Sequence, residues 1–208
     1  MRAFLFFIAI LHYSIDVKSC RNNPVTELEK MMSGQIFDGG DEEIDAIRTN
    51  ATKTLLKLNS STDAEERITL QAELLGKVGN SYIQPPFHCE FGKTIEIGEQ
   101  TFINMNVVML DGAKITIGSH VLIGPSVQFY TASHSLDYRS RLKWETFCKP
   151  ITIEDSVWIG GNSVINQGVT IGARSVIAAN SVVNSDVPPD CLYGGTPAKL
   201  IRRLDEAS

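Results

Sequence analysis

From residue 82 onward, an aliphatic or aromatic residue recurs at every sixth position of the chain. A two-residue slip precedes Ile117, and a long break separates Phe129 from Ile153. The members of the series are Phe91, Ile97, Ile103, Met109, Ile117, Ile123, Phe129, Ile153, Ile159, Ile165, Ile171, Ile177 and Val183. Four residues after most of them stands a small or β-branched residue. A period of six fits neither an amphipathic helix nor a simple alternating strand, and it indicates a solenoid of hexapeptide repeats.

Each hexapeptide is expected to form one short strand, with its lead residue in a narrow interior and the small residue at a corner. Three strands complete a coil, so the series predicts about four complete coils, with a partial coil before them at residues 85–92. Insertions into a stack of coils must leave from its corners. The slip and the break both fall at boundaries between coils, which predicts an excursion loop at residues 130–150 of a mainly β solenoid.

Residues 24–78 follow a different, helical pattern. Thr26 with Glu29, and Thr62 with Glu65, have the spacing of capping boxes, and Gly34 and Gly76 follow as stop signals. Between the two boxes an apolar stripe runs at three- and four-residue spacing: Ile44, Ile47, Ala51, Leu55 and Leu58. We expect these helices to pack on the solenoid through that stripe.

Composition limits the range of partners. The chain has 208 residues, of which 43% are hydrophobic, enough for one main domain with a small appendage. Its net charge of -5 provides no general basic surface, so nucleic acid is not an expected partner. The four cysteines are widely spaced, without a CxxC pair or a His/Cys cluster, and they predict neither a metal site nor a disulfide framework.

Residues 1–20 have the outline of a secretory signal peptide. Arg2 precedes an apolar run, and Ser19 is a small residue near its end. The run is too short to span a bilayer, so no membrane span is predicted. The alternative is an upstream extension, or a mis-assigned start, on a cytoplasmic protein.

Several stretches carry a resemblance to a known family: "FINMNVVMLDGAKITIG", "YTASHSLDYRSR", "KPITIEDSVWIGGNSVINQGVTIG" and "VPPDCLYGGTPAKLIRRL". Together they resemble the maltose and galactoside O-acetyltransferases of the hexapeptide acyltransferases. Residues 24–78 resemble the small helical domain of that family, and residues 79–203 its β-helix. The resemblance implies a left-handed parallel β-helix, a homotrimer and acetyl-CoA as co-substrate.

His134 in "YTASH" matches the family position of the catalytic base. Acetyl transfer from a thioester to a hydroxyl needs a group that removes the hydroxyl proton, and a neutral imidazole suits that task near pH 7. We therefore expect His134 to act as general base in a direct transfer, with backbone or side-chain amides stabilising the oxyanion.

The resemblance also implies binding residues. Asp38, Glu90 and Asn104 match or adjoin acceptor-contacting positions, and Asp111 stands where the galactoside enzymes carry paired acids. An Asp111-Gly112 sequence at that place leaves the identity of the sugar open. The positions implied for acetyl-CoA are Gly160, Gly161, Ala179, Asn184, Ser185, Lys199 and Arg202. Glycines let the pantetheine arm lie close to the backbone, and the cations suit the phosphates of coenzyme A.

The leading hypothesis is an enzyme that moves acetyl from acetyl-CoA to a sugar hydroxyl. Acetylation of a small amine or xenobiotic on the same fold, use of a longer acyl group, and a non-catalytic sugar-binding solenoid are the alternatives. Because acetyl-CoA is a cytosolic metabolite, a cytoplasmic location is favoured over the secretory pathway. The excursion contains three apolar residues, Leu142, Trp144 and Phe147. A neighbouring subunit packed on the excursion would bury them, which favours the homotrimer.

Overall fold

The computed structural model of the protein describes residues 24–142 and 145–204. Its helical part begins with α1 (Glu27–Met32), which Thr26 caps. The Thr26 hydroxyl accepts from the Glu29 backbone N–H, and the Glu29 carboxylate accepts from that of Thr26, so this predicted capping box is confirmed.

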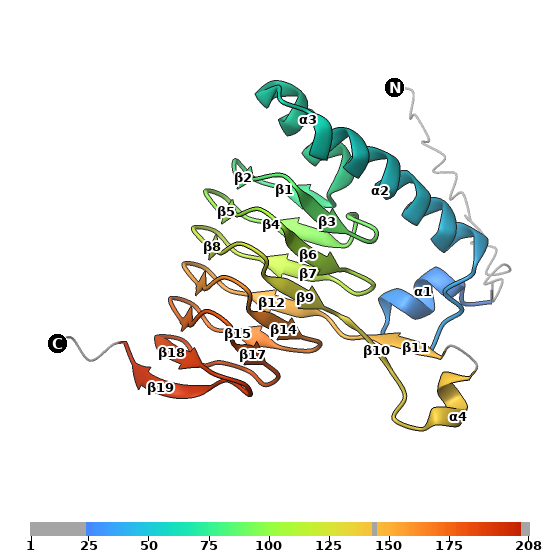
Figure 1. The fold of residues 1–208 in the computed structure, drawn as a ribbon. Helices are drawn as coiled ribbons and strands as arrows, with labels where there is room; N and C mark the ends of the chain where they lie inside the picture. The colour runs from blue at the N-terminus through green and yellow to red at the C-terminus, as the bar shows by residue number, and fades with distance from the viewer. Residues whose placement is uncertain (1–23, 143–144, 205–208) are drawn as a thin grey trace, which may run out of the picture.

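Helices α2 (Glu42–Ser60) and α3 (Ala64–Leu74) lie against one end of the solenoid, as Figure 1 shows. The predicted stripe faces inward: Ile44, Ala51 and Leu58 are buried. The predicted cap at Thr62 is wrong, because Asp63 occupies that position and accepts from the Glu66 backbone N–H. A carboxylate satisfies the positive N-terminal end of a helix as well as a hydroxyl does, and it adds a favourable charge.

The rest of the chain winds into coils of three strands, and equivalent strands pair in parallel (Figure 1). The first sheet contains β1 (Lys77–Val78), β4 (Ile95–Ile97), β7 (Ile115–Ile117), β12 (Ile151–Ile153) and β15 (Thr170–Ile171). The second sheet contains β2 (Tyr82–Ile83), β5 (Phe102–Ile103), β8 (Leu122–Ile123), β13 (Trp158–Ile159), β16 (Val176–Ile177), β18 (Cys191–Gly194) and the antiparallel β19 (Lys199–Arg203). The third sheet contains β3 (Phe87–Cys89), β6 (Val107–Leu110), β9 (Gln128–Tyr130), β14 (Val164–Asn166) and β17 (Val182–Val183). The predicted parallel β-helix is confirmed.

The lead residues of the hexapeptides fill the interior, and those from Ile97 to Val183 are at most 2% exposed. The structure has more coils than the predicted four, because β1, β2 and β3 already form a full coil that starts at Lys77. Val187 and β18 begin a further coil after β17. Phe91 was wrongly assigned to the series: the register pairs Cys89 with Met109, so Cys89 holds the inward position. Phe91 lies beyond that strand and packs in a second cluster with residues of the helical part.

The excursion leaves the third sheet after β9 and returns at β12. Its two strands, β10 (Ala132–His134) and β11 (Thr146–Cys148), pair antiparallel, and α4 (Tyr138–Arg141) lies near their far end (Figure 1). Leu142 is 76% exposed and Phe147 is partly buried, while Trp144 lies outside the described residues. This hairpin, with α4, stands away from the stack (Figure 1).

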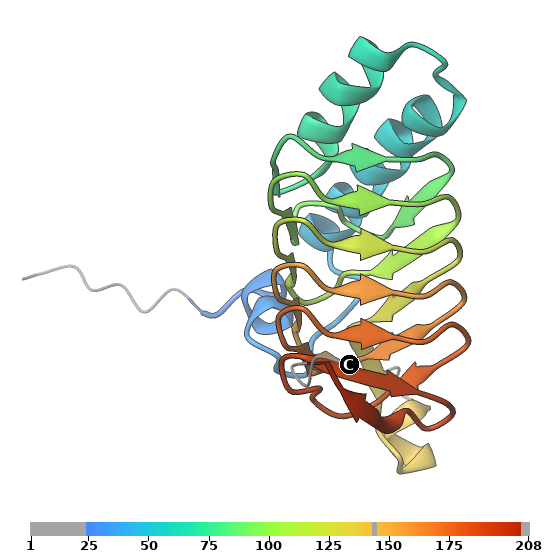
Figure 2. The same ribbon diagram turned by 90° about the vertical axis from the view of Figure 1, so that its left-hand side faces the viewer.

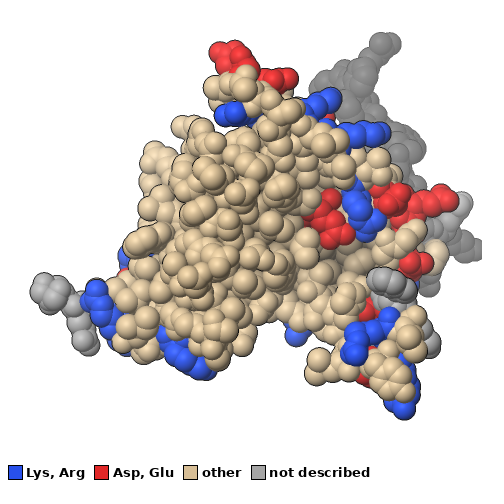
Figure 3. All heavy atoms as spheres, viewed as in Figure 1, with Lys and Arg blue, Asp and Glu red and all other residues tan. Residues whose placement is uncertain are grey.

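The outer faces of the first and second sheets differ in chemistry. The outward residues of the first sheet are polar: Lys77, Glu96, Thr116, Thr152 and Thr170. The second sheet, which faces the viewer in Figure 2, presents an apolar column: Tyr82, Phe102, Leu122, Trp158, Val176 and Leu192. In Figure 3 the charged side chains gather on the helical part and the excursion, cations also lie at the C-terminal end of the solenoid near β19, and the middle of the stacked coils is uncharged. Within the described ranges, no helix is long and apolar enough to cross a membrane.

Candidate active site

His134 is held at the end of strand β10 with its ring orientation fixed. Its Nδ1 lies 3.1 Å from the backbone oxygen of Glu145 and 3.4 Å from the hydroxyl oxygen of Thr146. A carbonyl oxygen can only accept, so Nδ1 carries the proton in the neutral ring and Nε2 keeps its lone pair. The side chain faces a hollow of about 660 Å³ that Glu145, Lys149 and Gln167 also line. The geometry therefore presents an imidazole base to a space large enough for a ligand.

A second hollow, of about 950 Å³, lies between the helical part and the base of the excursion. Asp38 and Glu90, both predicted to bind the acceptor, line it together with Arg48 and Glu145. Glu145 lines both hollows, so the second hollow adjoins the one that holds His134. The structure thus brings Asp38 and Glu90 to the neighbourhood of the expected base.

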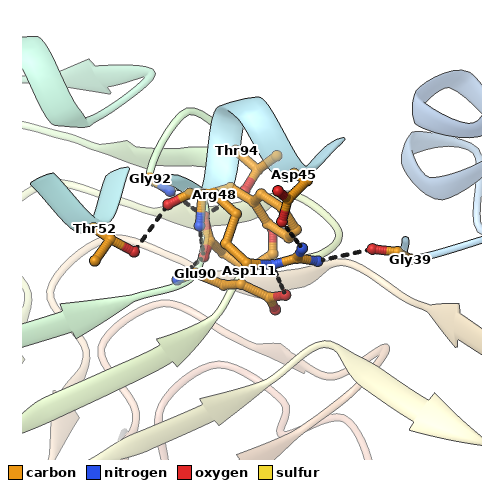
Figure 4. A network of polar contacts seen from close by, with 9 residues as sticks. Gly39, Asp45, Arg48, Thr52, Glu90, Gly92, Thr94 and Asp111 are labelled. Carbon is orange, nitrogen blue, oxygen red and sulfur yellow. Dashed lines mark hydrogen bonds and ion pairs between the residues drawn. The ribbon is translucent and has the colours of Figure 1, made fainter. Parts of the chain in front are cut away.

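Arg48 of α2 joins the helical part to the solenoid at this hollow (Figure 4). Its Nε donates to Glu90 Oε1 at 3.2 Å, its Nη1 to Asp45 Oδ1 at 3.1 Å and its Nη2 to the Gly39 carbonyl at 3.3 Å. The guanidinium also lies over the ring of Phe91, 5.3 Å from its centroid. Burial raises the pKa of Glu90, and the hydrogen bond from Arg48 opposes that effect.

Asp111 lies beneath Glu90 and is 0% exposed. Its carboxylate accepts from the backbone N–H groups of Glu90, Phe91 and Gly92 and from the Thr94 hydroxyl, at 2.6 to 3.0 Å (Figure 4). The prediction that Asp111 contacts an acceptor does not fit this placement, because its oxygens are already bonded and shielded from solvent. Asp111 instead fixes the turn that carries Glu90.

Two cysteines, Cys89 and Cys148, lie close enough to Glu90 for its charge to act on their thiols. Burial raises the pKa of Cys148 to about 11, and burial also raises the pKa of Cys89. Both are free thiols, and at neutral pH they remain protonated. They are therefore poorly suited to carry an acetyl group as a thioester.

A third hollow, of about 670 Å³, runs along the apolar column of the second sheet. Asn104, predicted for the acceptor, lines it with Gly160, Gly161 and Ala179, predicted for acetyl-CoA. Gly160 is also required by the coil, because a Cβ there would lie 2.5 Å from the Ala179 backbone nitrogen. Within one chain this groove is separate from the hollow of His134, since they lie at different corners of the coils.

The remaining donor positions lie toward the C-terminal end of the solenoid. Asn184 and Ser185 are exposed after β17, and Lys199 and Arg202 are exposed on β19. Among the described residues these four side chains form no hydrogen bond or ion pair, so their polar groups are available to a ligand. The same part of the chain contains no group of three or more His, Cys, Asp or Glu residues that could hold a metal ion.

Arg48 and Glu145 were not identified from the sequence. Arg48 lies on the polar face of an amphipathic helix, where its spacing of three from Asp45 indicates only a surface ion pair. Glu145 reaches the site because β10 and β11 pair across the excursion, and no periodicity in the sequence predicts that pairing.

Comparison with known proteins gives two family matches within the chain. A maltose acetyltransferase hexapeptide capping motif matches residues 30–79, and a bacterial transferase hexapeptide motif of six repeats matches residues 150–185. The galactoside O-acetyltransferase of Escherichia coli is 35% identical over 188 residues, which cover 89% of this chain and 92% of that protein.

Solved structures match most of the chain. A hexapeptide-repeat acetyltransferase from Vibrio cholerae, complexed with acetyl coenzyme A, is 70% identical with a TM-score of 0.83, covering 86% of this chain and 98% of that one. A maltose O-acetyltransferase from Clostridium difficile is 36% identical with a TM-score of 0.86, covering 88% of this chain and 100% of that one.

Proposed function

The chain belongs to the maltose and galactoside O-acetyltransferase family and is an acetyl-CoA-dependent acetyltransferase. From this premise we propose that it acetylates a sugar hydroxyl. One observation carries the proposal: the His134 Nδ1 is anchored 3.1 Å from a carbonyl oxygen beside a hollow lined with carboxylates. Hydroxyl groups donate readily to carboxylate oxygens, and His134 Nε2 remains available as a base. The names of the galactoside and maltose enzymes support a sugar as the acceptor class.

In the proposed reaction, the acceptor hydroxyl attacks the thioester carbonyl directly while His134 Nε2 removes its proton. The carbon–sulfur bond then breaks, and the imidazolium returns the proton to the departing coenzyme A thiolate. The protonated state of Cys89 and Cys148 supports transfer without an acetylated cysteine. An N–H donor near the thioester carbonyl would stabilise the oxyanion, and we propose the Asn104 amide or a neighbouring backbone amide for this role.

For the donor, we propose that the pantetheine arm lies along Gly160, Gly161 and Ala179. The groove there is lined largely by apolar residues and glycine backbone, which suits a chain with few charges. Asn184 and Ser185 are proposed to contact the next part of coenzyme A, and Lys199 and Arg202 its phosphates and adenine end. The exposure of the two cations on β19 supports this assignment.

We further propose a homotrimer in which each active site lies between two subunits. Tyr82, Phe102, Leu122 and Trp158 are 36% to 53% exposed and form one continuous apolar column. Such a column indicates a protein interface, and a heterologous contact repeated around a threefold axis closes into a ring. The separation of the His134 hollow from the Gly161 groove within one chain supports a site completed by a neighbour.

The cytoplasm is the compartment that best suits this reaction, because acetyl-CoA is a cytosolic metabolite. Residues 1–20, whose sequence has the outline of a signal peptide, lie outside the described residues. Fractionation of cells that express the full chain, with acetyltransferase activity followed in each fraction, tests the compartment.

A coupled thiol-release assay tests the activity itself. Acetyl-CoA is offered with a panel of sugars and small amines, and the product is identified by mass spectrometry and by its lability to hydroxylamine. We expect an ester on a sugar. Turnover of amines alone, with a hydroxylamine-stable amide as product, would contradict the proposal.

A further inference from the structure

The hollow lined by Asp38, Arg48, Glu90 and Glu145 carries an unbalanced charge. Its described lining residues include the carboxylates of Glu27, Asp38, Glu90 and Glu145, and a single guanidinium, that of Arg48. Sugars of similar shape differ widely in charge. The balance of charges around this space therefore bears on which of them the enzyme accepts.

Arg48 cannot offer its charge to an anionic ligand. Each of its three nitrogens already donates to a protein oxygen, two of them on the carboxylates of Glu90 and Asp45. One face of the guanidinium is covered by the Phe91 ring. An anionic acceptor would have to displace these bonds and approach the neighbouring carboxylates, which is electrostatically unfavourable.

Glu27 is likewise fully engaged. Its Oε1 accepts from Lys30 Nζ at 2.5 Å and its Oε2 from the Asp38 backbone N–H at 2.7 Å. The other three lining acidic residues, Asp38, Glu90 and Glu145, each keep at least one carboxylate oxygen without a hydrogen-bond partner among the described residues. Glu90 uses Oε1 for Arg48, and Asp38 uses Oδ1 for the Gly40 N–H, while the second oxygen of each has no partner among the described residues. The Glu145 carboxylate has none there at either oxygen.

Glu90 and Glu145 are the best placed of these groups. Both are partly buried, whereas Asp38 is exposed to solvent, which screens its charge. Asp111 holds the turn that carries Glu90 through three backbone N–H groups, so the Glu90 carboxylate is preorganised. Glu145 is next to Thr146 on the excursion, and its own backbone oxygen orients His134. A cation held by these two carboxylates would therefore lie near the base.

We propose that this hollow selects an acceptor that carries a protonated amine close to the hydroxyl to be acetylated, as an amino sugar does. Glu90 and Glu145 set the preference. The inference rests on the proposed sugar O-acetylation and specifies its substrate class. The ammonium binds the two carboxylates and keeps its proton, so it is not the nucleophile. The hydroxyl oxygen forms the new ester bond, and coenzyme A leaves as the thiol.

The test compares three sugars of one frame: glucosamine, glucose and glucuronic acid. At about pH 6.5 most of the amine is protonated and the carboxylic acid is ionised. We expect kcat/KM for glucosamine to exceed that for glucose by about tenfold or more, the effect of one additional charge contact. Glucuronic acid should be the poorest acceptor, and the glucosamine product should be a hydroxylamine-labile ester.

Variants then assign the preference to its residues. Glu90→Gln and Glu145→Gln should each lower the glucosamine-to-glucose ratio several-fold, with the KM for acetyl-CoA unchanged. Glu65→Gln, a matched change at an exposed position in the first turn of α3, should leave the ratio as it is. If Glu90→Gln is misfolded because Arg48 loses its partner, the wild-type charge series and Glu145→Gln still decide the matter.

A wild-type enzyme that acetylates all three sugars at similar kcat/KM would overturn this inference and leave the proposed function in place. So would a clear preference that neither variant reduces. Absence of thiol release with any sugar would overturn the proposed function, and the inference with it.

Discussion

At the scale of single residues, His134 illustrates how a backbone group determines side-chain chemistry. An unanchored imidazole exchanges its proton between two nitrogens, and each tautomer presents a base in a different direction. The carbonyl of Glu145 removes that freedom, because it accepts from Nδ1 and leaves Nε2 as the basic atom. Glu145 thus supports the base with its backbone, and it also lines the hollow that contains Asp38 and Glu90.

Replacement of His134 by Ala is expected to lower turnover by about two to four orders of magnitude, the usual loss for a general base. Acetyl-CoA binding and thermal stability should be unchanged, since the ring is exposed and its loss creates no cavity. Steady-state kinetics at saturating substrates and calorimetric titration with acetyl-CoA measure the two effects. His120→Asn is the matched control, because Asn tolerates the positive φ of 59° at that corner. Near-normal turnover of His134→Ala would reject the assignment.

At the scale of elements, the turn between β3 and β4 depends on Asp111. Replacement by Ala would leave three backbone N–H groups, two of them buried, without their acceptor, while the Thr94 hydroxyl keeps its bond to the backbone oxygen of residue 111. We expect a loss in unfolding free energy of about 3 kcal/mol or more. Activity should fall as well, because Glu90 loses its support. Urea unfolding followed by circular dichroism measures the loss, and the more conservative Asp111→Asn should be milder. Equal stability of Asp111→Ala and the wild type would show that the turn is held by other contacts.

The elements also show how far the sequence alone can be taken. The hexapeptide period predicts the β-helix because each inward position repeats the same packing, and the same regularity locates the excursion as a break. Phe91 fits the period by coincidence, since the register of β3 places Cys89 inside instead. The observed N-cap of α3, Asp63, is one residue after the predicted Thr62, because both residue types can cap a helix and they are adjacent in the sequence. The Arg48–Glu90 pair joins residues 42 positions apart, and no local pattern encodes such a contact.

Strand β19, which pairs with β18, carries the two cations proposed to bind the nucleotide end of coenzyme A. A Lys199→Ala, Arg202→Ala double variant should raise the KM for acetyl-CoA by about tenfold to a hundredfold, the loss of one or two charge-assisted bonds to phosphate. A donor truncated to acetyl-pantetheine lacks the phosphates and adenine, so its KM should change little. Kinetics with both donors give the comparison. Equal losses for the two donors would mean that the cations act through the fold of this hairpin.

At the scale of the whole molecule, exposed apolar side chains are concentrated on two parts of the surface, which is unusual for a monomer. A polar first sheet suits solvent, but the apolar column of the second sheet leaves Trp158 53% and Leu122 50% exposed. The excursion likewise exposes Leu136 and Leu142. In a ring of identical subunits, each interface pairs two different surface patches, and the apolar column and the excursion provide two such patches on each chain.

If each active site is built from two subunits, two different inactive variants can complement each other. A site contained in one subunit would not allow this. A His134→Ala chain lacks the base but keeps its donor groove, and a Gly161→Phe chain lacks the groove but keeps its base. Each should be inactive by itself. If base and groove come from neighbouring subunits, unfolding and refolding the two chains together in equal amounts should make about a quarter of the sites whole, by random assembly.

Activity in the mixture near that fraction, with sedimentation showing a trimer, is the expected outcome. The two variants refolded separately and then combined without exchange serve as the control, and they should stay inactive. Mass spectrometry of intact complexes confirms that hybrids have formed. An active monomer, or inactive hybrids whose composition has been verified, would place base and donor groove in the same subunit.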